Sequence, residues 1–314
     1  MHGKVVIIGA GHVGSHVARA LMAGQGPDEI VLVDILPGKA ESQAMDIMDA
    51  LSYPPAKGVV RSGTYEDCAT ASLTVIAIGK AREPGQTRLD LLGDSTRMIF
   101  DLAMSLRDIT ITGPVICITN PCDIMADCMR RLLNLDRFQV FGTGTLLDTA
   151  RLLRTLSEQT GCSTKDIAAW VLGEHGDSSM VPFSSVMIAG REASEFPGYN
   201  PEEALRRTHE IGMDIINGKG STEFGIGQVT AFLIRSILTG SGVILPLSVH
   251  LEGEYDLNDV QCGVPCVTCK SGIKRITQLP LTDEEQLALR KSAGVIEQYT
   301  RQALEIIDGL MKTK

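Results

Sequence analysis

A histidine between glycines is the side chain in this sequence best suited to acid–base chemistry. His175 lies in the segment GEHGD at residues 173–177, directly after an apolar run, and a free imidazole gains and loses a proton near neutral pH. A lone histidine is usually structural, but Asp148 and Arg151 accompany it, and residues three apart share one face of a helix. An imidazole, a carboxylate and a guanidinium could together bind an anion and transfer a proton.

Two further arginines, Arg82 and Arg88, lie in a loop rich in proline and glycine after an expected sheet strand. They could be solvated loop charges. The chain has a net charge of −9 and a pI near 5.2, however, so arginines that converge on a cleft would indicate an anionic ligand. The same negative charge argues against a nucleic acid as partner.

The sequence begins with an apolar strand, Lys4–Ile8, that runs into a glycine-rich turn. The turn has the pattern GxGxxG, formed by Gly9, Gly11 and Gly14. These glycines permit a tight turn and let the backbone approach a pyrophosphate. The helix that follows, beginning near His12 and Val13, supplies N–H groups and partial positive charge. We therefore expect a dinucleotide-binding site here.

Asp34 stands twenty residues after Gly14, at the end of the second expected strand. At that position a carboxylate accepts hydrogen bonds from the ribose hydroxyls and would repel a 2′-phosphate. We therefore expect the cofactor to be NAD rather than NADP. Gly79, which ends another expected strand, could let the chain pass close to the cofactor or could be a simple turn.

The order of expected elements indicates the fold class. Short β-branched runs alternate with helical stretches in the first half, as in a parallel sheet built from βαβ units. We expect an α/β protein with a Rossmann-type doubly wound parallel sheet over residues 1–143, followed by an α+β substrate and catalytic domain over residues 144–314. The first-half strands are expected at Lys4–Ile8, 30–33, 73–78, 115–118 and 139–141. The second half should hold a strand at 170–172, a strand and hairpin turn over 243–255, and a terminal helix over 282–311 with a capping box.

In its motifs and their order the chain resembles the L-lactate/L-malate dehydrogenase family of NAD-dependent L-2-hydroxy acid dehydrogenases. The resemblance covers nearly the whole length. Its motifs are the GxGxxG turn, TNP at 119–121, GTG at 142–144, LDTAR at 147–151 and GEHGD at 173–177. It implies reversible hydride transfer between NADH and C2 of a short 2-oxo acid.

The resemblance also implies roles for the residues around the histidine. His175 would donate a proton to the carbonyl oxygen and take it back in oxidation. Asp148 would hold the imidazole in the required tautomer and stabilise its protonated form. Arg151 would bind the C1 carboxylate through two hydrogen bonds, and Asn120 would orient substrate and histidine while also touching the cofactor.

Loop and helix-start residues complete the implied site. Arg88 would polarise the substrate carbonyl from a lid at about residues 81–92 that closes over the site. Ile226 matches a family position that gives the nicotinamide an apolar wall, although the stretch could equally be ordinary packing at a helix start.

The substrate is the point on which the sequence signals disagree. Arg82, six residues before Arg88, occupies a position where malate enzymes have arginine and lactate enzymes usually have glutamine. Thr222 and the C-terminal third instead resemble the lactate branch. We expect malate and oxaloacetate, because a guanidinium facing a methyl group would be unpaired in a dry pocket. Lactate and pyruvate, or another 2-hydroxy acid, remain alternatives, as does a non-catalytic NAD-binding protein, against which the full residue set argues.

Location, metal content, assembly and regulation follow from weaker signals. The chain runs from Met1 directly into a strand and has no apolar run near the roughly 20 residues of a membrane span, so we expect a cytoplasmic protein with no membrane contact.

Cys262, Cys266 and Cys269 have loosely metal-like spacing, but a strand is expected there and no fourth ligand is near, so no metal is expected. The resemblance implies a homodimer or homotetramer. It also implies no fructose bisphosphate site, because Leu153 replaces the arginine of activated bacterial lactate enzymes.

Overall fold

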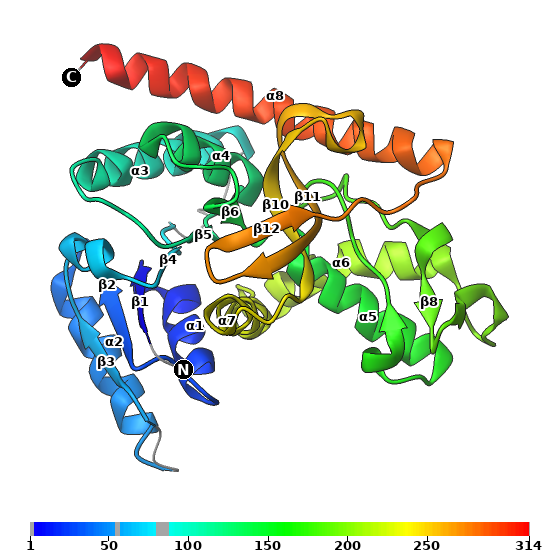
Figure 1. Cartoon of the computed structure of the whole chain (residues 1–314), viewed down its shortest axis with the longest axis horizontal. Coiled ribbons are helices and arrows are strands. Elements are labelled where there is room, and N and C mark those ends of the chain that lie inside the picture. Colours follow the sequence, from blue (N-terminus) through cyan, green and yellow to red (C-terminus); the bar gives the residue numbers. More distant parts are fainter. Residues whose placement is uncertain (1–2, 54–56, 80–87, 314) are drawn as a thin grey trace.

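The computed structural model describes residues 3–53, 57–79 and 88–313. Among these residues the strands form a nine-stranded sheet at the centre of the molecule, in the order β12-β11-β10-β6-β5-β4-β1-β2-β3 (Figure 1). The six strands of the first half run parallel. They are β1 (Lys4–Ile8), β2 (Glu29–Val33), β3 (Val59–Ser62), β4 (Leu73–Ile76), β5 (Val115–Cys117) and β6 (Val140–Gly142). Their order, 3-2-1-4-5-6, is that of the dinucleotide-binding fold, and the predicted fold class is confirmed.

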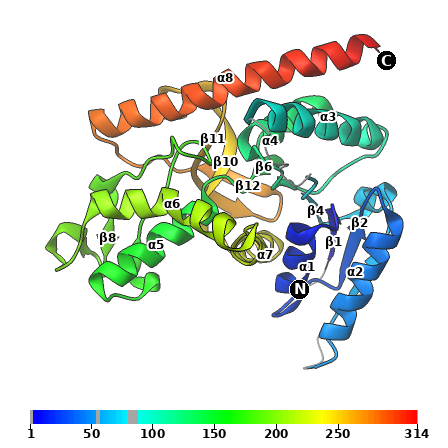
Figure 2. The same ribbon diagram turned by 180° about the vertical axis from the view of Figure 1, so that it is seen from behind.

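Helices cover both faces of these parallel strands (Figures 1 and 2). α1 (His12–Met22) and α2 (Pro37–Ala50) lie on one face, and α3 (Arg88–Leu106) and α4 (Cys122–Leu133) lie on the other. Strands covered on both sides need apolar side chains throughout, which is why β1 has the sequence KVVII and is buried along nearly its whole length.

Three antiparallel strands from the second half extend the same sheet. β10 (Ile244–Glu252), β11 (Asn258–Cys269) and β12 (Gly272–Ile276) pair in sequence, and β10 joins β6 at Ser248 and Gly142. The long α8 (Asp283–Thr313) crosses α3 and α4 (Figure 2). It begins with the predicted capping box, in which Thr282 and Glu285 exchange hydrogen bonds of 3.0 and 3.2 Å.

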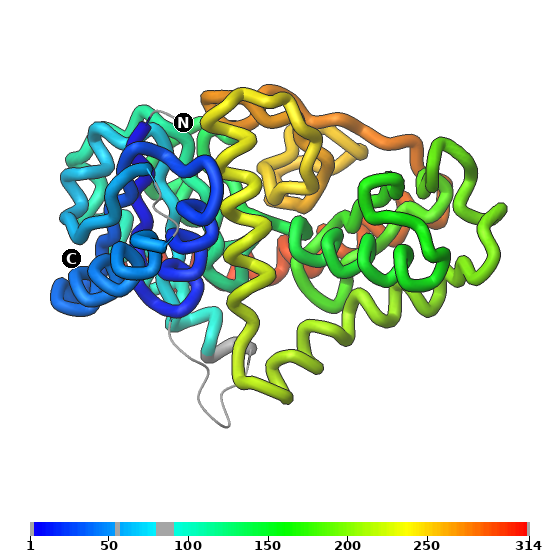
Figure 3. The backbone as a smooth tube through the Cα atoms, turned by 90° about the horizontal axis from the view of Figure 1, so that it is seen from below, coloured from blue at the N-terminus to red at the C-terminus, as the bar shows by residue number. Residues whose placement is uncertain are grey.

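A second hydrophobic core lies at one end of the molecule. It packs α5 (Leu146–Thr160) and α6 (Pro201–Lys219) around a small sheet of β7 (Ile167–Ala168), β8 (Met187–Ile188) and β9 (Arg191–Glu192). Figure 3 shows this part in green, with α7 (Phe224–Thr239) between it and the blue N-terminal strands and helices. The larger core draws residues from both halves of the chain, and the domain boundary at 143/144 stays a prediction.

The strand predicted at residues 170–172 is wrong. Only an isolated bridge between Leu172 and Met180 forms there, and Gly173 makes another with Gly263. Gly173 has a φ of 96°, a left-handed conformation that turns the chain away after one paired residue. The strand of this region is β7, which begins three residues earlier.

The cysteine-rich segment is a strand, as expected. Cys262, Cys266 and Cys269 all lie in β11, the first two fully buried. In the part of the chain that the structure describes, no group of three or more histidine, cysteine, aspartate or glutamate side chains could hold a metal ion. No helix among the described residues is long and apolar enough to cross a membrane.

Candidate active site

The structure brings His175, Asp148 and Arg151 together as the sequence predicts. Nδ1 of His175 lies 2.6 Å from one carboxylate oxygen of Asp148. The Arg151 guanidinium donates to the other oxygen at 2.9 Å. α5 carries the carboxylate and the guanidinium one turn apart in its first turns, so a single helix positions both against the histidine.

Electrostatics favours a charged pair. The negative charge of Asp148 raises the pKa of His175 to about 9, although burial opposes it. Burial raises the pKa of Asp148, but His175 and Arg151 outweigh that effect and bring the pKa below its usual value. At neutral pH the imidazole therefore holds a proton that it can donate to a substrate oxygen.

The loop that carries His175 is fixed by hydrogen bonds from three other elements. Gly173 exchanges backbone hydrogen bonds with Gly263 of β11, at 2.9 and 3.0 Å. The backbone N–H of Glu174 donates to Ser292 Oγ of α8 at 2.8 Å. That of His175 donates to Asp123 Oδ2 of α4, also at 2.8 Å. The imidazole is thus held at the meeting point of both halves of the chain.

Asp123 was not predicted as a site residue. It follows Asn120 by three positions in the segment NPCD, and the only signal in the sequence is that nearness. Its contact with the site is to a backbone N–H 52 residues away, which no local pattern reveals.

The GTG turn between β6 and α5 depends on glycine. Gly144 has a φ of 50°, and a Cβ there would lie 2.5 Å from the backbone nitrogen of Ser248 in β10. The close approach lets α5 start directly beside the antiparallel strands. The direction of α5, and with it the position of Asp148, follows from this turn.

The glycine turn after β1 has the shape that a dinucleotide needs. A Cβ on Gly9 would lie 2.4 Å from a backbone oxygen of Ala77, and one on Gly14 would lie 1.9 Å from that of Gly9, so strand and helix pack without room for side chains. Gly11 is the N-cap residue of α1 and has no side chain to cap the first N–H groups. A Cβ built on it would have one described neighbour within 4 Å, the Lys39 ammonium at 3.9 Å. The first N–H groups of α1 at His12 and Val13 are therefore available to a pyrophosphate.

Asp34 directly follows β2, and its carboxylate points toward the glycine turn. It accepts hydrogen bonds from the backbone N–H of Ala10 at 2.9 Å and of Leu36 at 3.0 Å. Among the described residues no atom comes within 4 Å of a Cβ built on Gly79. The residues present thus fit NAD, with a fixed carboxylate at the ribose position and open backbone beside it.

The start of α7 lies against the glycine turn. Nδ1 of His12 lies 3.3 Å from Oε2 of Glu223, and the predicted substrate residue Thr222 directly precedes Glu223. Ile226 packs partly buried on the main core. Asn120 lies three residues after the end of β5 at an exposed position, in a cis peptide bond with Pro121, and its carbonyl accepts a hydrogen bond from Ser95 Oγ at 2.8 Å.

The arginine loop is only partly covered by the structure. Arg82 and most of the expected lid lie outside the described residues, and Arg88 is the first residue of α3. Their predicted roles stay predictions.

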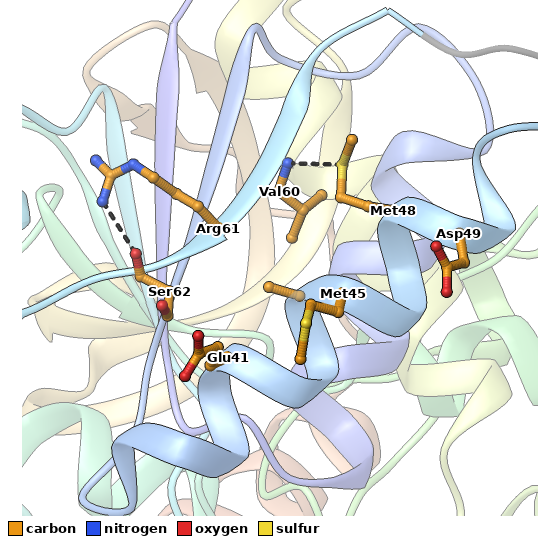
Figure 4. A pocket seen from close by; sticks show the side chains of 8 residues that line it. Glu41, Met45, Met48, Asp49, Val60, Arg61 and Ser62 are labelled. Atoms are coloured by element: carbon orange, nitrogen blue, oxygen red, sulfur yellow. Dashed lines mark hydrogen bonds between the residues drawn. The ribbon is translucent and has the colours of Figure 1, made fainter.

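A separate groove of about 410 Å³ lies between α2 and β3 (Figure 4). Figure 4 shows methionine side chains of α2 facing β3, with the Val60 N–H donating to Met48 Sδ. The side chains that line it are Glu41, Ala44, Met45, Met48, Asp49, Val60, Arg61 and Ser62. None of these is a predicted cofactor or substrate residue, so the groove is distinct from the active site.

Comparison with known proteins decides the family. A family model described as lactate/malate dehydrogenase, NAD binding domain, matches residues 3–142, and one described as lactate/malate dehydrogenase, alpha/beta C-terminal domain, matches residues 145–306. The chain belongs to the lactate/malate dehydrogenase family. It is an NAD-dependent 2-hydroxy acid dehydrogenase, as the sequence motifs predict.

Individual members of the family resemble this dehydrogenase over nearly the full length. An L-lactate dehydrogenase of Macrococcus caseolyticus is 35% identical over 300 residues, covering 94% of this chain and 95% of that protein. The minor L-lactate dehydrogenase of Enterococcus mundtii superposes with a TM-score of 0.92 at 29% identity, covering 95% and 98% of the two chains. The malate dehydrogenase of Archaeoglobus fulgidus in complex with NADH gives a TM-score of 0.87 at 31% identity, covering 96% and 99%.

Proposed function

We propose that this dehydrogenase catalyses the reversible reduction of pyruvate to L-lactate by NADH. The observation that carries the proposal is the pairing of His175 with Asp148 at 2.6 Å, beside Arg151. It combines a proton donor with a cation suited to a carboxylate, and reduction of a 2-oxo acid requires both.

The residues divide the reaction between them. Arg151 binds the C1 carboxylate and fixes the position of C2. NADH, when bound at the turn of Gly9 to Gly14, supplies the hydride that C2 accepts. His175 transfers its proton to the carbonyl oxygen in the same reduction, and Asp148 stabilises the imidazolium beforehand. Arg88 polarises the carbonyl as charge develops on its oxygen, and Asn120 orients the substrate.

Lactate takes precedence over malate, which was the first expectation from the sequence. Relatives 34–35% identical to this chain, from Macrococcus caseolyticus, Staphylococcus saprophyticus and Staphylococcus aureus, are named L-lactate dehydrogenases. Thr222 agrees with them. These observations outweigh the single signal of Arg82.

Malate remains the second candidate function because of Arg82. A guanidinium facing the C3 carboxylate of oxaloacetate would contribute a charge-assisted hydrogen bond of roughly 1.5–3 kcal/mol, or about 10- to 150-fold in selectivity. That is enough to decide between the two substrates, so kinetics can separate the candidates.

The test is kcat/KM for pyruvate and oxaloacetate on the wild type, Arg82→Gln and Arg97→Gln. We expect wild type to prefer pyruvate at least about tenfold and both variants to keep that preference. Arg97 is the matched control, since it is an exposed arginine of α3 that pairs with Asp94. A wild-type preference for oxaloacetate that Arg82→Gln reverses and Arg97→Gln does not would establish malate instead. Failure to oxidise NADH with any 2-oxo acid would overturn both.

Assembly and location belong to the same proposal. We infer a cytoplasmic enzyme that works on a small 2-oxo or 2-hydroxy acid and forms a homodimer or homotetramer, as the family resemblance implies.

A further inference from the structure

A second carboxylate lies beneath the loop that carries His175. Asp123 is in the first turn of α4, and its exposed fraction is 1%. Its Oδ2 accepts the backbone N–H of His175 at 2.8 Å. Its Oδ1 is buried and has no hydrogen-bond partner among the described residues. Among the described residues the one hydrogen bond of normal geometry to this carboxylate comes from the residue proposed as proton donor, and the Ser248 side chain also acts on the carboxylate.

Among the described residues no arginine or lysine pairs with Asp123. The titratable and polar groups that face it are His175 and Glu174 from the loop, Ser248 from β10, Cys262 from β11 and the adjacent Cys122. Burial raises its pKa to about 6, although Ser248 and His175 oppose the effect. Asp127, one turn further along α4, is equally buried but is paired with Arg130 and Arg131. Two arginines thus stabilise the charged form of the buried Asp127. The cation that faces Asp123 among the described residues is the imidazole of His175.

A buried charge without such a partner is costly. An asparagine at position 123 could accept the same backbone hydrogen bond without that cost, so the hydrogen bond alone does not account for a carboxylate. What only the carboxylate supplies is negative charge beside His175. The charged groups that face the imidazole are Asp148 and Arg151 from α5 and Asp123 from α4, and the two carboxylates raise its pKa while the arginine lowers it.

We propose that Asp123 is a positioning residue that holds the backbone of His175 and, by its charge, extends to more alkaline pH the range in which that histidine keeps its proton. The inference rests on the proposed role of His175 as proton donor.

The sign of the effect follows from the order of the two titrations. Above about pH 6 Asp123 is ionised, so it is negative throughout the range in which the imidazole loses its proton. Reduction of a 2-oxo acid needs the protonated imidazole, and kcat/KM falls as the pH rises through the pKa of His175. Without the charge of Asp123 the imidazole loses its proton at lower pH, and the alkaline limb moves with it.

The experiment compares Asp123→Asn with Ser292→Ala. Ser292 is the matched control, because it is also fully buried and accepts the neighbouring N–H, that of Glu174, at the same 2.8 Å but without charge. The readouts are the pH dependence of kcat/KM for reduction of pyruvate or oxaloacetate, whichever is used better, and the titration of the His175 ring by NMR. We expect Asp123→Asn to move both to lower pH by roughly half to one unit and Ser292→Ala to move neither.

Two outcomes would overturn the inference. One is an unshifted ring titration in Asp123→Asn, and the other is an equal shift in Ser292→Ala, which would assign the effect to loosening of the loop. A shifted ring titration with an unshifted kinetic profile would instead contradict His175 as proton donor, so failure of the proposed function is distinguishable.

A second variant keeps the test independent of how well asparagine fits. Asp123→Ser also lacks the charge, and its hydroxyl is too short to reach the His175 N–H, so it should give the same shift of the ring titration together with a lower kcat. Thermal unfolding of each variant at pH 8 reports whether it is folded. A ring titration equal to that of the wild type in a folded Asp123→Ser would also contradict the inference.

Discussion

Two carboxylates on different helices hold His175, one at its ring and the other at its backbone. Asp148 fixes the ring, and with it the tautomer that can donate from the far nitrogen. Asp123 fixes the main chain that carries the ring. Residue types and helical spacing predicted that Asp148 and Arg151 share one helix face, and the family resemblance implied that Asp148 holds the imidazole. The Asp123 contact could not be predicted, because a backbone N–H is common to every residue and carries no sequence signal.

At the residue scale we predict that His175→Asn binds NADH normally and loses turnover. The amide cannot take up and deliver a proton, and general acid–base catalysis contributes about 10²- to 10⁴-fold. His209→Asn is the control, since His209 contacts Ser179 of the same loop at 2.9 Å and has no proposed catalytic role. Steady-state kinetics and NADH fluorescence titration measure the two effects. Turnover in His175→Asn equal to that of His209→Asn would remove His175 from the mechanism.

At the element scale five of the six parallel strands could be predicted closely, whereas β3 (Val59–Ser62) was missed and the joining of the two halves could not be predicted. β1 has the predicted bounds, because a run of four apolar residues, Val5 to Ile8, before a glycine turn is a local signal. The contact of β10 with β6 pairs Ser248 with Gly142, and pairing across about a hundred residues depends on packing that no short window contains. The expected strand at 170–172 failed for a related reason. Val171 packs in the second core while Trp170 and Leu172 pack on the larger one, and apart from the Leu172 bridge the run does not pair as a strand.

The turn at Gly144 is the element-scale feature most open to test. We predict that Gly144→Ala lowers the free energy of unfolding by more than Gly161→Ala does. Both glycines have positive φ, 50° and 70°, so an alanine is strained by about 1–2 kcal/mol at either site. A Cβ at Gly161 meets nothing within 4 Å, whereas one at Gly144 meets the Ser248 backbone at 2.5 Å. Urea unfolding of the two variants measures the difference, and equal losses would show that the close approach is unimportant.

At the scale of the whole molecule the active site is where separate parts of the chain meet. The loop of His175 donates backbone hydrogen bonds to α4 in the first half and to α8 in the second, and exchanges hydrogen bonds with β11. The cofactor turn contacts the start of α7 through His12 and Glu223. Cofactor and substrate residues therefore keep their relative positions only when the whole sheet is assembled, and neither half contains a complete site.

The last prediction concerns assembly and regulation of the whole enzyme. We expect light scattering to give two or four times the chain mass of 33.7 kDa, with no change in mass or activity on adding fructose 1,6-bisphosphate. Leu153, which stands where activated bacterial lactate enzymes carry arginine, packs against the second core. An apolar side chain at that place offers a phosphate neither charge nor hydrogen-bond donors. Inorganic phosphate at equal ionic strength is the control. A rise in activity or in tetramer content with the sugar bisphosphate, and not with phosphate, would show that a cationic site exists elsewhere.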